Sequence, residues 1–318
     1  MKITKSALII LILALISGSG LRLAGVIAKR QVGMDEGISL LAATGHEGEY
    51  YRVTRQRIPP YGIWTRVREW KRLILPEDPF CFKRIGRELA EYDVHPPLYF
   101  WLLHLWLLIF GVAPFSGPLL NVLLFLPSAF VLYGLARFWM KNDREAALVT
   151  FIWSVSPAVI EVSWIARSYG LLILWTILFA GVVTRLAGNE KRSHPIRDRI
   201  FLGIFAAAGL LTHYAFLYLL SGGVVYLFIR RIQDIRAAAK NILALLIGVG
   251  VVLIFHPRFY HSFLIQRGQA ARSPYGGLGF RAEKTVTAFL DFFVGSRVIQ
   301  REVLIAGAIL TAVFLIYR

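Results

Sequence analysis

The chain has 318 residues, of which 57% are hydrophobic and only 17% are charged, and its formal net charge is +17. Soluble domains run about 45–50% apolar and about 25% charged, so this composition excludes an ordinary soluble globular protein. The basic residues lie between long apolar runs, which favours loops that face anionic lipid and a site that handles phosphate, rather than a nucleic-acid partner.

The apolar runs predict an all-α, polytopic integral membrane protein that forms a single domain over residues 1–318, with about eight transmembrane helices. The first run, residues 6–28, resembles a signal peptide, but it is long enough to span a bilayer, which favours an uncleaved anchor. The last run ends beside Arg318, so the chain is expected to be either a short protein or part of a longer membrane domain. The later runs are residues 118–139, 145–159, 168–187, 200–214, 215–229, 241–256 and 302–317.

Residues 29–117 form a long segment that decides the topology. Its last part, residues 96–111, covers about sixteen apolar residues, where a span needs about 20. If this part stays in the interface or re-enters, three later basic loops fall on the same side as Lys2 and Lys5, as the positive-inside rule expects. We prefer this arrangement over a crossing, and it puts residues 29–117 on the outer face. The basic loops contain Arg137, Lys141 and Arg144, then Arg185, Lys191, Arg192, Arg197 and Arg199, then Arg230, Arg231, Arg236 and Lys240.

The outer segment is expected to contain interfacial helices. In residues 63–75, apolar residues recur near helical spacing with basic residues between them, which predicts an amphipathic helix on the membrane surface. Phe82, Ile85, Leu89 and Tyr92 predict a second one. For both, a solvated helix packed on the protein is the alternative. Near the other end of the chain, the Gly-rich stretch 276–279 favours a flexible basic loop.

Asp35 and Glu36 form an acidic pair just after the first span. Charge near a membrane is costly to desolvate, so adjacent carboxylates at this place suggest a role. One carboxylate can accept the proton of an attacking hydroxyl as a general base. A simple surface acid pair is the alternative.

Asp93 and His95 precede two prolines at the start of an apolar run. The prolines disfavour helix in the residues before them, so both polar side chains are predicted to lie at a rigid approach to the helix. The alternative is a helix start that Asp93 merely caps.

Arg167 and His213 lie in two short turns between apolar runs. A guanidinium in so apolar a setting needs an anion, and a phosphate suits its bidentate geometry. Snorkelling to lipid headgroups or a pair with Glu161 are the alternatives for Arg167. A histidine near a membrane is a functional candidate, and a structural bond to a backbone carbonyl is its alternative.

In their order, these motifs resemble the GT-C superfamily of membrane glycosyltransferases. The branch that they resemble most is that of the protein O-mannosyltransferases and the lipid A aminoarabinose transferases. The resemblance covers about residues 6–230. It consists of a first span, the acidic pair, a long outer loop, Asp-x-His-Pro-Pro-Leu-Tyr at 93–99, Ser156-Pro157, Ala166-Arg167-Ser168-Tyr169 and Thr212-His213-Tyr214.

The resemblance implies an inverting enzyme on the outer face of a bacterial or archaeal-type plasma membrane. Its donor would be a polyprenyl-phosphate sugar, and its acceptor a glycolipid, polysaccharide or protein of the cell envelope. The resemblance implies that Asp35 is the general base, with Glu36 assisting. It places His95, Arg167 and Tyr169 near the donor phosphate, where they would stabilise charge on the leaving group. Asp93, His213 and Tyr214 are further substrate-binding candidates.

A metal requirement stays open from the sequence. Asp35, Glu36 and Asp93 offer oxygen ligands of the kind that Mg²⁺ or Mn²⁺ takes.

Two other functions compete with sugar transfer. A transporter or flippase of an anionic lipid-linked substrate would bury ionisable residues mid-span and repeat its halves, whereas here such residues concentrate at span ends and no repeat is evident. A non-catalytic scaffold or inactive homologue is the second alternative. It would be favoured if Asp35 and Arg167 lay far apart.

Overall fold

The computed structural model describes residues 3–56, 66–93, 95–188 and 194–256, and also 258, 259, 262 and 264. The regular structure of these residues is entirely helical, which confirms the predicted all-α class. The elements are α1 Lys5–Ala28, α2 Met34–Thr44, α3 Glu47–Gln56, α4 Val67–Arg72, α5 Phe82–Glu91, α6 Leu98–Phe110, α7 Ser116–Met140, α8 Asp143–Val155, α9 Pro157–Glu161, the 3₁₀ helix η1 Val162–Trp164, α10 Tyr169–Ala187, α11 Pro195–Thr212, α12 Phe216–Arg230 and α13 Ile235–Phe255.

Within the described ranges, four helices are long and apolar enough to cross a membrane: α1, α7, α10 and α13. A fifth span is possible by length if α8 and the α9–η1 segment are counted as one bent helix. Helices α6 and α12 are apolar but shorter. The protein is therefore an integral membrane protein, but the predicted number of eight spans is not confirmed. The predicted span 302–317 and the loop 276–279 lie outside the described residues.

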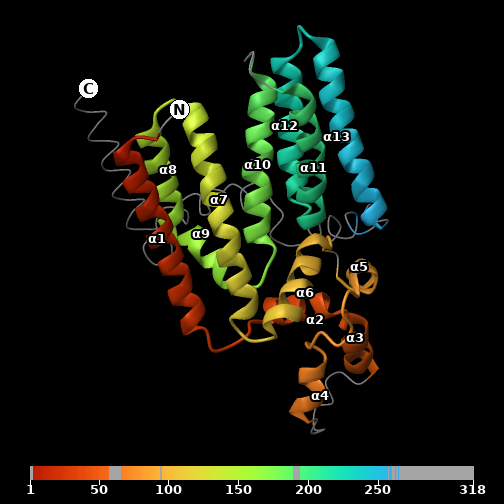
Figure 1. Cartoon of the computed structure of the whole chain (residues 1–318). Helices are drawn as coiled ribbons and strands as arrows, with labels where there is room; N and C mark the ends of the chain where they lie inside the picture. The colour runs from red at the N-terminus through yellow and green to blue at the C-terminus, as the bar shows by residue number, and fades with distance from the viewer. Residues whose placement is uncertain are drawn as a thin grey trace, which may run out of the picture.

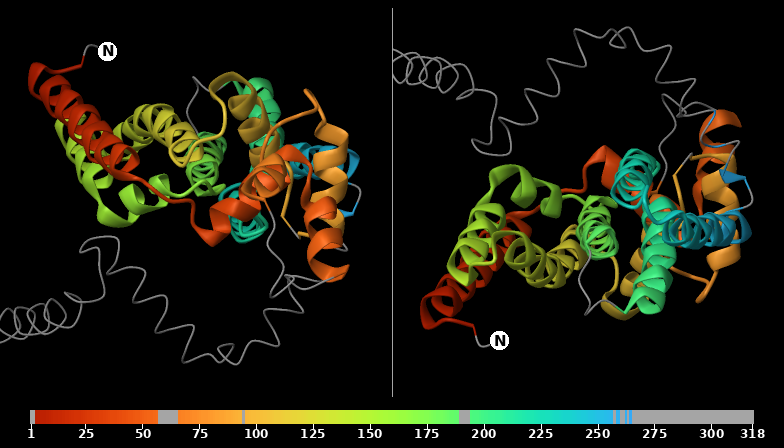
Figure 2. Two further views of the ribbon diagram at one scale, coloured as in Figure 1. Left: turned by 90° about the horizontal axis from the view of Figure 1, so that it is seen from below. Right: turned by 90° about the horizontal axis from the view of Figure 1, so that it is seen from above.

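The helices stand side by side in a row rather than around one central axis (Figures 1 and 2). Helix α1 packs on α8, α7 lies against α8 and α10, and α10 packs on α11, which in turn packs on α13. At the α1 end, Ala7 and Leu11 share a buried cluster with Ala146 and Ala147 of α8. That residues 6–28 are retained as an anchor stays a prediction.

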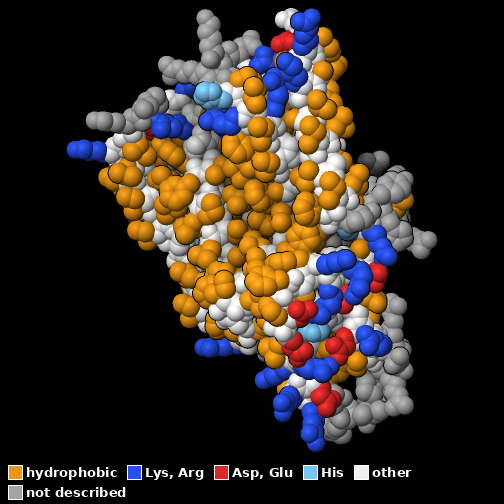
Figure 3. Space-filling model, turned by 45° about the vertical axis from the view of Figure 1, so that its right-hand side comes forward, with side chains coloured by type: hydrophobic (Ala, Val, Ile, Leu, Met, Phe, Trp, Pro, Cys, Tyr) orange, Lys and Arg blue, Asp and Glu red, His pale blue; other side chains and the backbone are white. Residues whose placement is uncertain are grey.

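Helices α2 to α5 gather at the lower end of Figure 1, where α1 ends and α7 begins. The arginines and lysines of the inter-helix loops stand at the opposite end, and an apolar band separates the two ends (Figure 3). Helix α6 does not qualify as a span by length. This arrangement supports the preferred topology, in which residues 29–117 remain on one side of the membrane. That this side is the outer one stays a prediction.

The two expected interfacial helices turn out differently. In the first, the described residues 66–75 contain the short α4, none of whose side chains is buried, and then Leu73, which is buried. The second is α5, where Ile85 and Leu89 are completely buried in a cluster with Leu40 of α2 and Leu103 of α6. Helix α5 is therefore held on the protein by its apolar face, as the packed-helix alternative predicted.

The predicted span over residues 145–159 is not one straight helix. Helix α8 ends at Val155, and Ser156 takes an extended conformation, with φ −62° and ψ 125°, before α9 begins at Pro157. A residue before proline is disfavoured in the α conformation, which explains the break. The chain bends by 58° here, and α9 and η1 then lead into the loop that carries Arg167.

Candidate active site

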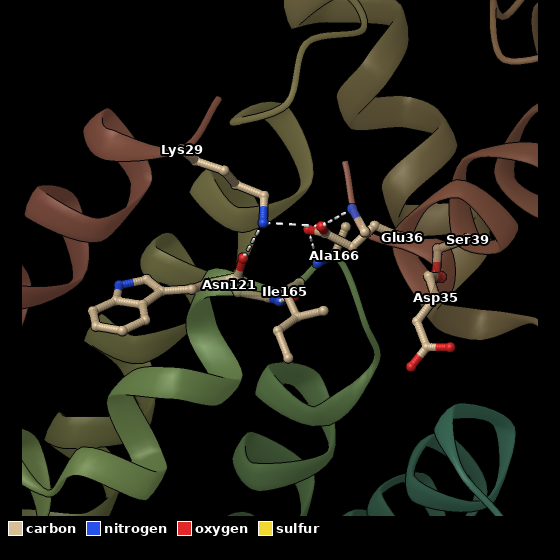
Figure 4. Close-up of polar contacts among 9 residues, drawn as sticks. Lys29, Asp35, Glu36, Ser39, Asn121, Ile165 and Ala166 are labelled. Atoms are coloured by element: carbon tan, nitrogen blue, oxygen red, sulfur yellow. Dashed lines mark hydrogen bonds and ion pairs between the residues drawn. The ribbon is translucent and has the colours of Figure 1, made fainter. Parts of the chain in front are cut away.

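The acidic pair at the start of α2 is divided between two environments. Glu36 is 3% exposed, and both of its carboxylate oxygens are engaged (Figure 4). Its Oε2 accepts a hydrogen bond of 2.8 Å from the Gly33 backbone N–H and forms an ion pair of 2.9 Å with Lys29 Nζ. Its Oε1 accepts a hydrogen bond of 3.0 Å from the Ala166 backbone N–H. Glu36 thus joins the end of the first span, the start of α2 and the loop before α10.

Asp35, by contrast, is exposed, and its carboxylate points away from the Lys29–Glu36 cluster (Figure 4). Among the described residues, no hydrogen bond or ion pair engages this carboxylate. Its backbone carbonyl accepts a bond of 3.0 Å from Ser39 Oγ. Because Asp35 lies in the first turn of α2, the positive end of the helix dipole stabilises its charge. The alternative of a simple surface pair is therefore wrong for Glu36, while Asp35 keeps a free carboxylate.

The loop that carries Arg167 is fastened to α7. Asn121, which is buried in α7, donates from Nδ2 to the backbone oxygens of Ile165, at 2.6 Å, and Arg167, at 3.2 Å. Gly117, one turn earlier, leaves the space that Ala166 fills, since a Cβ at this position would lie 2.3 Å from the Ala166 Cβ. The close approach of the loop to α7 therefore requires glycine at position 117.

Arg167, His95 and Asp93 form a chain of hydrogen bonds. Arg167 Nη2 donates to His95 Nε2 at 3.2 Å, and His95 Nδ1 lies 2.6 Å from Asp93 Oδ1. A guanidinium has donors only, so Nε2 must be the acceptor, and Nδ1 therefore carries the proton that it donates to Asp93. Asp93 is thus not the cap of α6, whose first position follows Pro97. Its role is to fix the tautomer of His95.

His213 lies beside this chain, and Tyr169 lies beside His213. The ring of His213 is centred 6.4 Å from that of His95 and 5.9 Å from that of Tyr169. Its Nδ1 accepts a bond of 3.0 Å from the Ala215 backbone N–H, so the alternative of a bond to a backbone carbonyl does not hold at this nitrogen. In the neutral ring, Nε2 therefore carries the proton. Tyr214 is buried, and its hydroxyl is 2.8 Å from His256 Nε2.

The structure brings most of the predicted residues to one place. Asp35 and Arg167 are each next in sequence to a residue of the Glu36–Ala166 hydrogen bond, and Arg167 continues to His95 and Asp93. No ion pair with Glu161 engages Arg167 within the described ranges, so that alternative is not supported. The described residues also contain no group of three or more His, Cys, Asp or Glu side chains that could hold a metal ion. Of the proposed oxygen ligands, Glu36 is engaged by Lys29 and Asp93 by His95.

Arg22 is a residue of this region that the sequence reasoning missed. Although it lies in α1, it is completely buried, and its guanidinium donates to Gly18 O at 2.8 Å, Ser154 O at 2.7 Å and Ser163 Oγ at 3.1 Å. It also stands 3.9 Å from the ring centroid of Phe125. Ser154 O is one of the carbonyls that the break at Ser156 deprives of a helical partner. Arg22 therefore stabilises the broken helix that leads to the Arg167 loop.

Lys29 and Asn121 were also missed. Lys29 Nζ binds Glu36 and, at 3.0 Å, the backbone oxygen of Trp164. The signal that could have found Arg22 and Asn121 is a single polar residue within a long apolar run, because such a residue is retained in a membrane span only when it has partners. Lys29, at the end of its run, gives no such signal.

Glu47 in α3 lies near Asp93 and is 2% exposed. Burial, together with the charges of Asp93 and Glu88, raises the pKa of Glu47 to about 9. The folded chain therefore holds a proton at neutral pH that the unfolded chain, with a carboxyl pKa near about 4.3, releases. Since the unfolded state binds fewer protons between these two values, the free energy of unfolding falls as the pH rises through this window.

We expect the Tm of the purified chain in detergent to fall between about pH 5 and about pH 8, and Glu47→Gln to flatten this slope. The glutamine amide resembles the neutral acid, so it removes the titration with little change of shape. Glu77→Gln, at an exposed position of the same segment, is the control and should keep the native slope. Parallel slopes for the native chain and Glu47→Gln would show that Glu47 does not hold this proton.

The sequence model of the family described as dolichyl-phosphate-mannose-protein mannosyltransferase matches residues 94–261, which is just over half of the chain. The match includes His95, Arg167 and His213, and it begins after Asp35 and Asp93. Searches of curated proteins and of solved structures found no significant match. The chain belongs to the dolichyl-phosphate-mannose-protein mannosyltransferase family, a GT-C family of membrane glycosyltransferases that use a polyprenyl-phosphate-linked sugar donor.

Proposed function

We propose that this glycosyltransferase passes a sugar to a hydroxyl group of a cell-envelope acceptor on the non-cytoplasmic face, with inversion at the anomeric carbon. The acceptor oxygen attacks the anomeric carbon as the bond from that carbon to the phosphate oxygen breaks. The electron pair of the broken bond stays on the phosphate, and the proton of the acceptor hydroxyl passes to Asp35. The products are a glycoside and the polyprenyl phosphate.

Asp35 is suited to be the base because its carboxylate is free and exposed at the start of α2. Glu36 cannot take this role without leaving its bonds to Lys29, Gly33 and Ala166. Its part is to position: it joins the helix that carries Asp35 to the loop that carries Arg167. This contact is the single observation that best supports the proposal, because it joins the sequence neighbours of the proposed base and of a permanent cation across 130 residues of sequence.

The leaving phosphate gains negative charge in the transition state, so fixed cations and N–H donors placed there lower the barrier. Arg167 is such a cation, and Asn121 and His95 hold the loop backbone and the guanidinium. The Nε2 proton of His213 and the exposed ring of Tyr169 lie beside it and complete the proposed phosphate side.

The transporter alternative has less support. Arg22 is a buried cation within a span, but the cavity beside it measures only about 10 Å³, roughly the room for one water molecule. No anionic substrate could pass there. The scaffold alternative required Asp35 and Arg167 to lie apart, whereas their sequence neighbours are hydrogen-bonded.

We expect Arg167→Gln to reduce turnover of a labelled polyprenyl-phosphate sugar by about 10²–10³, the cost of removing one preorganised charge-stabilising donor. The measurement is release of polyprenyl phosphate and formation of glycosylated product in membranes with equal amounts of each chain. Arg52→Gln, at an exposed position of α3, is the matched control and should keep native turnover. Movement of intact donor across the membrane without any sugar transfer by the native chain would instead establish the transporter alternative.

A further inference from the structure

A cavity of about 740 Å³ lies between the start of α5 and the end of α13. Its walls include the aromatic side chains of Phe82, Trp101 and Phe255. Trp101 Nε1 donates a bond of 2.9 Å to Phe82 O, and its ring packs edge-on against Phe255 with centroids 6.2 Å apart. These contacts fix the walls in place. Neither Asp35 nor Arg167 lines this cavity, so it is separate from the site described above.

The charge of the cavity is strongly positive. Its lining contains Lys83, Arg84, Arg87 and Arg258, with Asp78 as the acidic residue. Arg84 pairs with Asp78 at 3.2 Å, and Arg258 pairs with Glu91, which is not part of the lining, at 3.1 Å. Lys83 and Arg87 are exposed and have no ion pair with any described residue. Because they are four residues apart in α5, they lie on the same face of the helix.

The start of α5 adds an independent reason to expect an anion. The first turn of this ten-residue helix contains no acidic side chain. The side chain of its cap residue Cys81 does not cap the helix and instead donates to Thr44 O at 3.9 Å. The Phe82 N–H donates to Phe80 O at 2.8 Å, whereas the N–H groups of Lys83 and Arg84 have no partner among the described residues. Helix ends with free N–H groups bind phosphate.

We propose that this cavity binds the phosphate headgroup of an anionic glycerophospholipid of the surrounding membrane. The basic face of α5 and the start of the helix take the phosphate. The acyl chains lie along the end of α13, where Ile254 and Phe255 are 74% and 54% exposed on a helix apolar enough to span the membrane. The apolar walls distinguish this site from one for a free anion. The bound lipid holds the outer segment against the membrane. This anchoring function is separate from the proposed sugar transfer.

The experiment measures lipid binding alone, so it is independent of any sugar transfer. The full chain is placed in nanodiscs of phosphatidylcholine with a minor share of phosphatidylglycerol, and the retained phosphatidylglycerol is counted by native mass spectrometry. We expect the native chain to retain it and the double variant Lys83→Ala/Arg87→Ala to retain it about tenfold less. Gly86→Leu, which keeps every charge but fills the cavity between them, should weaken retention as well.

Arg66→Ala/Arg68→Ala is the matched control, because it removes the same charge from exposed positions of the same outer segment. Equal losses in the control and in Lys83→Ala/Arg87→Ala would show diffuse attraction to an anionic surface and overturn the proposal. Release of the lipid by inorganic phosphate would indicate a free-anion site and would also overturn it. Preferential retention of added polyprenyl phosphate over phosphatidylglycerol would assign the cavity to a donor or product lipid instead.

Discussion

Asp35→Asn is expected to reduce sugar transfer by about 10²–10⁴, the range that a positioned general base contributes. The asparagine amide has the same shape, but it cannot accept the proton that the acceptor hydroxyl loses. Asp35 has no bond from its carboxylate to another described residue, and Glu36 makes the contacts that hold α2 in place. The substitution should therefore leave the fold and the amount of protein unchanged. The measurement is product formation from a labelled polyprenyl-phosphate sugar at saturating donor.

Glu161→Gln is the control for this experiment, since Glu161 is also an exposed carboxylate, at the end of α9. We expect it to retain native turnover. If the two variants lost the same amount of activity, the effect would come from surface charge, and the assignment of Asp35 as the base would be wrong. A variant Asp35→Asn that kept native turnover would refute the assignment directly.

Gly117→Ala is expected to lower turnover by about 10²-fold, because a shift of about 1 Å in a reacting group can have that effect. The added Cβ would lie 2.3 Å from the Ala166 Cβ and 3.2 Å from its Cα, so the loop must move away from α7. This movement strains the bond from the Ala166 N–H to Glu36 and displaces Arg167. The loss should appear in kcat rather than in the amount of folded protein, because the clash is with the loop residue Ala166 and not with the packing of one helix on another.

Gly134→Ala is the corresponding control in the same helix, where a Cβ meets nothing within 4 Å. It should retain native kcat. Similar losses in both variants would indicate a general effect on α7 and contradict the proposed contact with the loop. The double variant Gly117→Ala/Ala166→Gly removes the clashing methyl group, and recovery of turnover there would confirm the steric cause.

The spans that could be predicted from the sequence are those set by local properties. Residues 6–28 and 168–187 were predicted within a residue of α1 and α10, since apolar length alone defines such helices. For the runs 200–214 and 241–256, the predicted starts lie several residues after the observed starts of α11 and α13. These two helices begin with charged first turns, which the lipid headgroup region tolerates. The break at Ser156 was missed because the apolar run continues through it, although Pro157 is its cause.

In the candidate site, too, features set by nearby residues could be predicted, whereas contacts between distant parts of the chain could not. Asp93 and His95 were expected to lie close together because they are two residues apart in the sequence and are followed by two prolines. The contact of Arg167 with His95 spans 72 residues, and no spacing rule reaches that far. Which of Asp35 and Glu36 would be buried could not be foreseen either. Successive side chains on a helix point about 100° apart, and only the surrounding fold decides which one faces inward.

Arg22 has a consequence for the order of events during synthesis. Its hydrogen-bond partner Ser163 lies 141 residues further along the chain, and Ser154 lies 132 residues further. When α1 first enters the bilayer, neither partner has been made, and the guanidinium cannot shed its charge. Until then, it must extend to water and headgroups near the C-terminal end of the helix. Helix α1 therefore cannot reach its final depth in the membrane through hydrophobicity alone. It reaches that depth only after the broken helix that contains Ser154 and Ser163 has been synthesised and can bind Arg22.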